Sequence, residues 1–147
     1  MIRSKKIMLL TPGLNRAGQE KVVYELAKGF KSKGFKVEVA CFYGGPYKKE
    51  LESKDIKVTL LAESSSTVNV SKLKLYNNCK NFVKTKSDYN FIFHGIGFEK
   101  LWILYALTSY TIPFSVFVFH NNYPFINTQK LNFKKLQLKL FLRLIDK

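Results

Sequence analysis

Residues 6–42 read KIMLLTPGLNRAGQEKVVYELAKGFKSKGFKVEVACF, and their pattern predicts a strand, a helix and a second strand. The continuous apolar run at residues 7–10 is typical of a strand buried on both faces of a parallel sheet. Apolar residues then recur at helical spacing over residues 22–30, and Gly34 follows where glycine commonly ends a helix. Residues 36–42 predict the next strand. The order strand–helix–strand predicts a βαβ unit with parallel strands.

The same alternation continues along the chain. The sequence therefore predicts an α/β fold, a Rossmann-like parallel sheet of about five strands with helices on both faces and right-handed crossovers. Further strands are expected at residues 56–61, 90–94 and 114–119, and further helices at residues 47–53, 72–86, 98–110 and 129–146. The polar, serine-rich residues 63–70 predict a loop. All 147 residues are expected to form one domain, because a chain of this length usually builds a single core.

The chain carries a formal net charge of +15, from 25 Lys and Arg against 10 Asp and Glu. A field of this sign attracts anions, so nucleic acid, an anionic membrane surface and phosphorylated substrates are all open as partners. The arginines are Arg3, Arg16 and Arg143, and the lysines are spread over every predicted helix. Proteins read bases through the forked contacts that arginine makes, and few of the basic residues here are arginine. Specific nucleic-acid binding is therefore disfavoured. The 46% hydrophobic and 15% aromatic content excludes a disordered chain.

The two cysteines, Cys41 and Cys79, fit neither a metal-binding spacing nor a disulfide framework. Cys41 lies in an apolar strand pattern, which predicts a buried, reduced thiol and a cytoplasmic location. The apolar run at residues 7–10 is too short for a secretory signal. The apolar region at residues 91–120 is interrupted by charged residues and by Pro113, so it predicts buried strands and a helix rather than a membrane span.

Three segments are expected at the edge of the sheet where the strands end, namely residues 11–19, 94–97 and 120–122. Ligands of open parallel sheets bind at this edge. In the first segment, Gly13 and Gly18 allow a close approach of the backbone, and the helix that starts at Gly18 offers free N–H groups to a phosphate or to sugar hydroxyls. The segment has no Gly-x-Gly-x-x-Gly and no Gly-Lys-Ser/Thr motif, so an ordinary β–α loop is the alternative.

Both histidines, His94 and His120, directly follow predicted strands, which places them at the same edge. Histidine at such a position is a candidate for acid–base chemistry or ligand binding. No carboxylate is adjacent to either residue in sequence, and neither has a metal-ligand spacing, so no catalytic dyad and no metal site is predicted. A structural histidine is the alternative in each case.

Residues 129–146 predict a basic, amphipathic helix in which Lys135, Lys139 and Arg143 recur one turn apart. Its apolar side carries Phe133, Leu136, Leu140, Phe141 and Leu144. The pattern is typical of a helix that packs on the core and exposes a solvated basic face. Docking on an anionic membrane surface is the alternative interpretation.

Residues 6–10, 17–27 and 33–39 together resemble the N-terminal domain of GT-B glycosyltransferases of family 4 (group 1). That family opens with an apolar strand, a Gly-Gly-x-Glu-Arg loop and helix, and a Leu-x-x-x-Gly-His-x-Val stretch. Similarities to the family's third strand, its Asp-Val-Ile-x-x-His segment and its Thr-x-His turn lie at residues 55–58, 89–94 and 114–120. The resemblance covers essentially the whole chain and implies half of a GT-B fold.

The resemblance implies retaining transfer of a sugar from a nucleotide-sugar donor to a polysaccharide or lipid-linked acceptor, with no metal and no cofactor. It places His120 in the active-site cleft, near the transferred sugar, as the catalytic candidate. The implied substrate-binding residues are Gly13, Ala17, Gly18, Gln19, His94 and Asn121. It further implies a role in the biosynthesis of cell-envelope polysaccharide, in the cytoplasm and at the inner face of the membrane.

The sequence departs from the family pattern at three positions, where Ala17 replaces the first glycine, Lys21 an arginine and Phe35 a histidine. In the family, the nucleotide-sugar binds mainly to a C-terminal domain with a Glu-x7-Glu motif, which residues 1–147 do not contain. The chain is therefore expected to be inactive alone, whether as an isolated fragment, a truncated reading frame or one subunit of a split enzyme. A non-catalytic partner subunit or a membrane-docking module is the alternative function.

Overall fold

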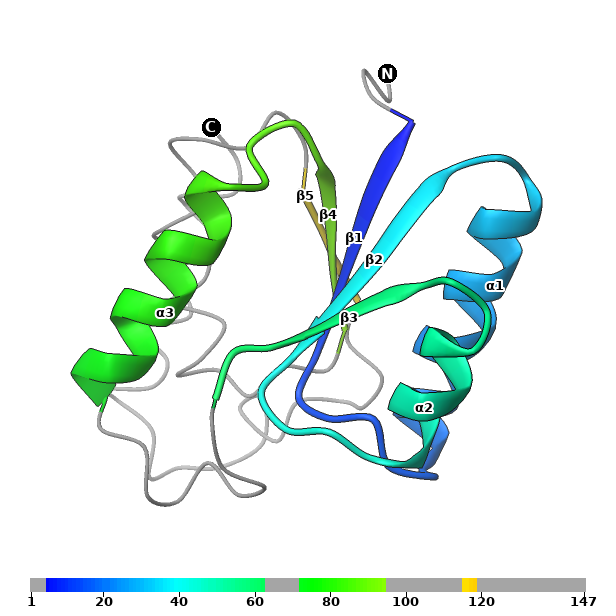
Figure 1. The fold of residues 1–147 in the computed structure, drawn as a ribbon, viewed down its shortest axis with the longest axis horizontal. Helices are drawn as coiled ribbons and strands as arrows, with labels where there is room; N and C mark the ends of the chain where they lie inside the picture. The colour runs from blue at the N-terminus through cyan, green and yellow to red at the C-terminus, as the bar shows by residue number, and fades with distance from the viewer. Residues whose placement is uncertain (1–4, 63–71, 95–114, 119–147) are drawn as a thin grey trace, which may run out of the picture.

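The computed structural model describes residues 5–62, 72–94 and 115–118. These residues form a sheet of five parallel strands in the order β3-β2-β1-β4-β5, which confirms the predicted fold class. Figure 1 shows the sheet with β1 between β2 and β4. The strands are β1 (Lys6–Thr11), β2 (Lys36–Cys41), β3 (Lys57–Leu60), β4 (Asn90–His94) and β5 (Ser115–Val118).

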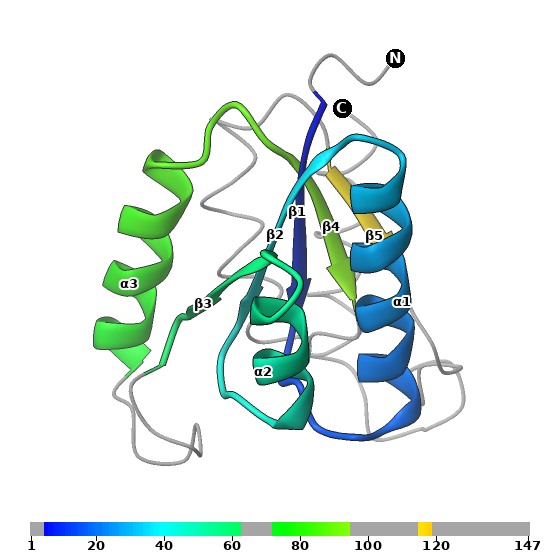
Figure 2. The same cartoon turned by 45° about the vertical axis from the view of Figure 1, so that its right-hand side comes forward.

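Helices cover both faces of this sheet, as the sequence predicts. α1 (Gly18–Ser32) and α2 (Pro46–Glu52) lie on one face, and α3 (Lys72–Lys84) lies on the other (Figures 1 and 2). The loop predicted at residues 63–70 and the helices predicted at residues 98–110 and 129–146 lie outside the described residues.

The alternation of side chains along the strands divides the core into two layers. Ile7 and Leu9 of β1 pack in the layer that α1 and α2 cover, whereas Met8 and Leu10 pack in the layer that α3 covers. All four side chains are at most 1% exposed. A strand buried on both faces needs apolar residues at every position, which explains the continuous apolar run of β1.

The ends of α1 follow the signals in the sequence. Gly34 has a φ of 79°, a left-handed conformation that glycine adopts without strain, and its N–H donates to Lys31 O at 3.0 Å. Pro46 occupies the first turn of α2, where a missing N–H leaves no helical hydrogen bond unmade.

β3 is shorter than the predicted strand by one residue at each end, and α3 ends two residues before the predicted Lys86.

One polar cluster is buried between the sheet and the end of α3. Lys86 Nζ donates to Glu38 Oε2, and Tyr89 Oη donates to Glu38 Oε1 at 2.5 Å. Glu38 is 5% exposed and Tyr89 is 3% exposed, so all three groups depend on one another for their hydrogen bonds. The cluster ties β2 to the α3–β4 connection and so fixes how α3 sits on the sheet.

We expect Tyr89→Phe to lower the free energy of unfolding by about 2 kcal/mol, because it removes a buried hydrogen bond to a charged group. Urea denaturation followed by circular dichroism measures this difference. Tyr24→Phe is the matched control, because the Tyr24 ring stacks on Tyr47 with centroids 4.7 Å apart and that contact does not use the hydroxyl. Equal losses in the two variants would show that the Tyr89 hydroxyl has no special role.

Glu38 also makes the stability depend on pH. Burial raises the pKa of the Glu38 carboxyl, but the hydrogen bonds from Lys86 and Tyr89 outweigh burial and hold the pKa below its ordinary value of 4.5. A carboxyl with a lowered pKa stabilises the fold above its unfolded-state pKa, and this contribution is lost as the pH falls through the folded-state pKa.

We therefore expect the free energy of unfolding to fall as the pH drops below about 4.5, and to fall less steeply in Glu38→Gln. Urea titrations at a series of pH values measure both slopes. The same acid dependence in the variant and in the unaltered chain would contradict the assignment to Glu38.

Candidate functional site

The strand order of the sheet reverses at β1. The chain proceeds from β1 through β2 to β3 on one side, and then returns to add β4 and β5 on the other side. α1, which follows β1, and α3, which precedes β4, lie on opposite faces of the sheet, and ligands of open α/β sheets bind at such a point of reversal. Here the point lies at the carboxyl ends of β1 and β4, which are Thr11 and His94.

Thr11 and His94 are neighbours across this point. The register pairs Leu10 with Phe93, so the next residues of the two strands, Thr11 and His94, follow side by side. Both lie on the face of α1 by the alternation of the strands, and their exposed fractions are 0% and 1%. Thr11 Oγ1 has no hydrogen-bond partner within the described part of the chain. Two buried polar side chains thus lie together at the predicted edge.

The first half of the β1–α1 loop is packed, not open. Pro12 O accepts hydrogen bonds from the N–H groups of Phe42 and Tyr43, at 3.0 and 3.3 Å. A Cβ atom built on Gly13 would lie 1.9 Å from Tyr43 Cε2, so only glycine fits beneath this ring. The close approach of the backbone that the sequence predicts at Gly13 is therefore made to the Tyr43 ring. This packing explains why position 13 is a glycine.

The second half of the loop is open. Arg16, Ala17 and Gly18 are exposed, and no atom lies within 4 Å of the position that a Cβ on Gly18 would take. Ala17 is the N-cap residue of α1 and provides no side-chain hydrogen bond to the first turn. The N–H groups at the start of α1 therefore remain available to a ligand, and the helix dipole adds positive potential there.

Glu20 limits how positive this end of α1 can be. It lies in the first turn and is 8% exposed. Its carboxylate interacts favourably with the helix dipole and opposes a second anion nearby. The end of α1 therefore suits sugar hydroxyls or a single phosphate group better than a densely charged ligand.

The loop is fastened to α2 by Arg16. Arg16 Nη2 donates to Glu50 Oε1 at 2.9 Å, and the guanidinium lies 5.9 Å from the centre of the Tyr47 ring. Tyr47 in turn stacks on Tyr24 of α1. Each of these surface contacts is weak alone, but together they hold the open tip of the loop between α1 and α2.

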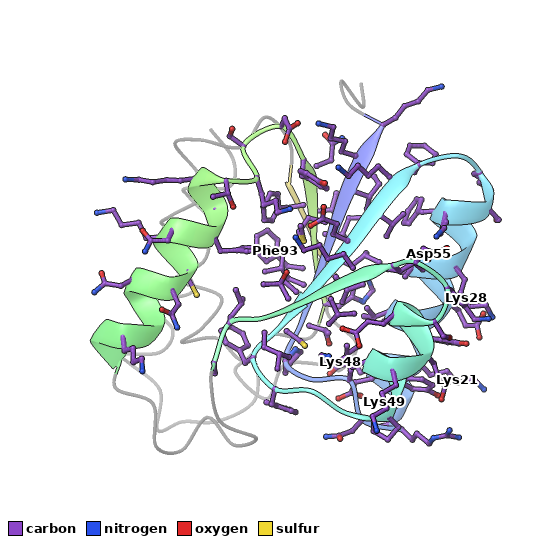
Figure 3. The ribbon with its side chains drawn as sticks, in the orientation of Figure 1. Lys21, Lys28, Lys48, Lys49, Asp55 and Phe93 are labelled. Atoms are coloured by element: carbon purple, nitrogen blue, oxygen red, sulfur yellow. The ribbon has the colours of Figure 1, made fainter. Side chains whose placement is uncertain are left out.

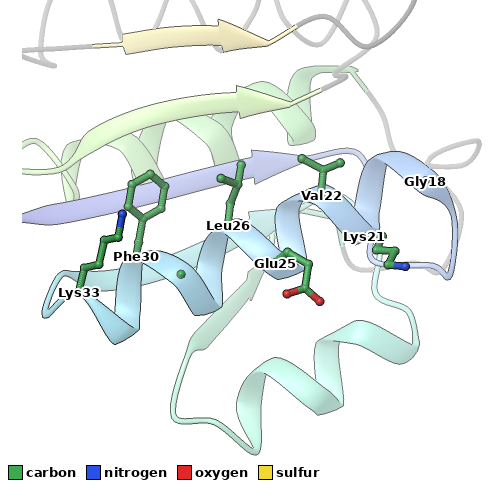
Figure 4. Close-up of a pocket in the computed structure, with 8 residues that line it drawn as sticks. Gly18, Lys21, Val22, Glu25, Leu26, Phe30 and Lys33 are labelled. Atoms are coloured by element: carbon green, nitrogen blue, oxygen red, sulfur yellow. The ribbon is translucent and has the colours of Figure 1, made fainter.

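A groove of about 470 Å³ runs along one flank of α1 (Figure 4). It starts at Gly18 and ends at Lys33, and the side chains of Val22, Leu26 and Phe30 line its length. The lining is mostly apolar, and its ionisable groups are Lys21, Lys33 and Glu25, whose carboxylate pairs with Lys28 at 3.0 Å. The groove therefore adds a hydrophobic surface beside the edge, not a reactive centre.

The described residues offer little redox or metal chemistry. Among residues 5–62, 72–94 and 115–118, no group of three or more His, Cys, Asp and Glu could hold a metal ion. Cys41 and Cys79 are free and buried, as predicted for Cys41, and burial raises the pKa of each thiol to about 12. Such thiols stay protonated and unreactive. No helix in this part of the chain has the length and hydropathy to cross a bilayer.

The structure brings most of the predicted residues to one edge. Ala17, Gly18 and Gln19 form the start of α1, and His94 ends β4 beside Thr11. His120 and Asn121 lie outside the described residues. Thr11 belongs to the predicted edge segment 11–19 without being singled out there, although a single polar residue at the end of an apolar run is a signal for it, and Tyr43 was not predicted.

No protein-family model matches the chain, and no curated protein sequence matches it significantly. Solved structures are similar to it. HepE (Alr3699) of Anabaena in complex with UDP-glucose has a TM-score of 0.62 at 19% identity, over 95% of this chain and 34% of HepE. HepE in complex with UDP has the same TM-score at 20% identity, over the same shares of both chains. The C-terminal domain of the PF1911 hydrogenase of Pyrococcus furiosus has a TM-score of 0.54 at 15% identity, over 81% of this chain and 95% of that one.

These similarities show the fold, a Rossmann-like α/β sheet. The chain spans about a third of the length of HepE. Identities of 15–20% carry the fold and not the function, because one fold hosts many activities. What this chain does therefore depends on its own edge residues as well as on its fold.

We expect Gly13→Ala to lower the free energy of unfolding by about 1–3 kcal/mol, because the added methyl group meets the Tyr43 ring. Gly18→Ala is the matched control, since its methyl group enters open space and alanine favours a helix by up to about 1 kcal/mol. Urea denaturation of both variants measures the contrast. Tyr43→Ala in the Gly13→Ala background should recover part of the loss, and absence of any recovery would contradict the packing explanation.

Proposed function

We propose that this chain is the acceptor-side domain of a GT-B glycosyltransferase, which moves a sugar from a nucleotide-sugar to a polysaccharide or lipid-linked acceptor. The observation that carries the proposal is the overlap of almost the whole chain with part of HepE, a protein whose solved structures contain UDP and UDP-glucose. The sequence resemblance to family 4, a retaining family, supports the same conclusion.

The residues at the carboxyl edge of the sheet would bind the donor and the acceptor and orient them. The backbone N–H groups around Ala17, Gly18 and Gln19, which no N-cap side chain occupies, can donate to a donor phosphate or to acceptor hydroxyls. Thr11 and His94 form the buried floor of the same edge, and a ligand hydroxyl there could satisfy Thr11 Oγ1. His120 and Asn121, which follow β5 in sequence, are the remaining candidates for the cleft, with His120 nearest the transferred sugar.

In the proposed reaction, the bond between the anomeric carbon and the diphosphate oxygen breaks, and a bond to the acceptor hydroxyl oxygen forms with retained configuration. Stabilising the negative charge on the departing diphosphate is the largest catalytic requirement of such a transfer. In the family that this chain resembles, a second domain meets it. We therefore expect residues 1–147 alone to bind ligands weakly and to catalyse no transfer.

Location and further contacts belong to the same proposal. A lipid-linked acceptor would bring the protein to the inner face of the membrane, with the basic residues Lys135, Lys139 and Arg143 as a contact. A C-terminal transferase half would be the protein partner. A non-catalytic subunit that recruits such a half is the second candidate function.

Ala17→Asp tests the proposed binding edge. Ala17 has the extended backbone of an N-cap, with φ −123° and ψ 169°, so aspartate there should cap α1 and raise the free energy of unfolding by about 1 kcal/mol. The same carboxylate occupies the free N–H groups and repels a phosphate. We therefore expect UDP-glucose to bind at least about tenfold more weakly to the more stable variant.

Titration of ¹⁵N-labelled chain with UDP-glucose, UDP and a short glycan measures the affinity and locates the binding. Shifts should concentrate at residues 15–20 and His94, and Lys49→Gln on the outer side of α2 should leave the affinity unchanged. An unchanged affinity in Ala17→Asp would argue against the edge as the binding site. Turnover of a nucleotide-sugar by residues 1–147 alone would contradict the expected inactivity.

A further inference from the structure

The groove along α1 opens at the candidate site. It extends from Gly18, at the carboxyl edge of the sheet, to Lys33 at the other end of the helix. A helix rises about 1.5 Å per residue, so these two residues lie roughly 22 Å apart along the axis. The volume of about 470 Å³ is within the range of ligand-binding clefts. The groove is therefore elongated, and it begins where a sugar acceptor would have to react.

The length of the groove is lined by apolar side chains. Figure 4 shows Val22, Leu26 and Phe30 on the same side of α1, whereas the Glu25 carboxylate points away from them. Leu26 and Phe30 pack partly against the core, but Val22 is 39% exposed. An exposed apolar side chain that continues a row of others forms a patch, and such patches mark binding surfaces.

Further apolar surface lies on the same face of the sheet. Ile92 of β4 packs in the core layer that α1 covers, and Val116 of β5 pairs with Ile92 in register. Residues paired across neighbouring strands point to the same face, so Val116 also lies on the face of α1, where it is 37% exposed. Among the side chains that the structure describes, three large apolar ones are exposed, and Val22 and Val116 are two of them. This face of the fold therefore has apolar surface left for a ligand.

Gly29 keeps the groove open. A Cβ atom on Gly29 would meet no atom within 4 Å, and its φ is not in the left-handed region. Neither contacts nor backbone conformation therefore require glycine here, although glycine makes a helix less stable than alanine does. Because Gly29 lines the groove, a side chain at this position would enter the space available to a ligand. The bare backbone thus favours the close approach of an elongated molecule.

The charges at the two ends of the groove favour an anionic group at the end near the candidate site. Lys21 lines the groove in the first turn of α1, and its ammonium group has no carboxylate partner within the described residues. Other surface lysines are unpaired as well, but at Lys21 the helix dipole and the uncapped N–H groups add to the positive charge. Lys33 lies at the opposite end of α1, where the dipole disfavours an anion.

We propose that the groove holds the hydrocarbon chain of a lipid-linked acceptor, with the phosphate of the lipid beside Lys21. Each methylene group that enters an apolar groove strengthens binding, whereas a polysaccharide rich in hydroxyl groups gains nothing from apolar walls. The role of the lipid as an acceptor rests on the proposed function. Within that function, the groove selects the lipid-linked class of acceptor over the polysaccharide class.

A second copy of the chain fits the groove less well. Two chains that met along α1 would bring together two net charges of +15, and they would place Lys21 and Lys33 of both copies in one interface. Like charges across an interface oppose association. A phosphorylated lipid carries the opposite charge, so charge complementarity favours the lipid as the occupant.

Titration of ¹⁵N-labelled chain with alkyl phosphates, below the concentrations at which they form micelles, tests the assignment. Decyl phosphate has the headgroup of hexyl phosphate and four more methylene groups. An open groove covers about half of each methylene, so we expect about twofold tighter binding per methylene and about 16-fold in total. Shifts should concentrate at residues 18–33. Decyltrimethylammonium, which has the same chain and a cationic headgroup, should bind more weakly than decyl phosphate.

Two variants separate the chain from the headgroup. Gly29→Gln places a polar side chain in the groove, so the advantage of decyl over hexyl phosphate should fall below about fourfold. Its control, Ser32→Gln, adds the same side chain to α1 outside the groove and should keep the full advantage. Lys21→Gln should weaken binding of both phosphates equally, by about threefold to fivefold. Its control is Lys49→Gln, because Figure 3 shows Lys49, like Lys21, at the outside of the α1 and α2 layer, and this variant should bind both normally.

Three results would overturn the proposal. Equal affinity for hexyl and decyl phosphate would show that the groove holds no chain. Contacts of the Val22 and Leu26 methyl groups with residues 129–146 of the chain without ligand would make that segment the occupant. The same contacts between differently labelled copies would make a second copy the occupant. Alkyl phosphates bind without a nucleotide-sugar, so UDP-glucose binding without any chain-length effect would remove the groove assignment and leave the proposed function standing.

Discussion

The burial of β1 on both faces is the constraint on which the rest of the structure depends. β1 pairs in parallel with β2 on one side and with β4 on the other, and its side chains enter both layers of the core. The central residues of such a strand, Ile7 to Leu10, are buried on whichever face they point to, so all of them must be apolar. The first residue that breaks the apolar run is Thr11, and it does so where the strand reaches the edge. The location of the candidate site is therefore a consequence of how the core is built.

The same constraint explains which features could be predicted from the sequence. Strands buried on both faces show as continuous apolar runs, and Gly34 signals the end of α1 because few other residues adopt its φ of 79°. These are local properties, and within the described residues they predicted the order of strands and helices correctly. Gly13 could not be interpreted locally. It reads as a flexible loop residue, but it is buried because Tyr43, distant in sequence, covers it.

For the charged residues too, some properties are visible in the sequence and others only in the fold. The net charge of +15 predicts an anionic partner but not where it binds. Glu38 lies in a strand that reads as apolar, and only the fold brings Lys86 and Tyr89 to it. The sequence thus supplies the charges, and the packing decides which of them pair.

The β1–α1 loop combines a packed base with an open tip, and this combination is what a binding edge requires. Its base is held by Tyr43 and by hydrogen bonds to Pro12, and its tip is fastened through Arg16 to α2. The uncapped N–H groups of α1, which directly follow these anchors, are therefore held in place before a ligand arrives, which reduces the entropy lost on binding. HepE and a hydrogenase domain share the sheet with this chain, so the sheet alone cannot specify an activity. The specific chemistry must come from short segments such as this loop. Serine or aspartate at the N-cap would accept a hydrogen bond from the first turn of the helix, whereas the alanine found there cannot, so that N–H group stays available to a ligand.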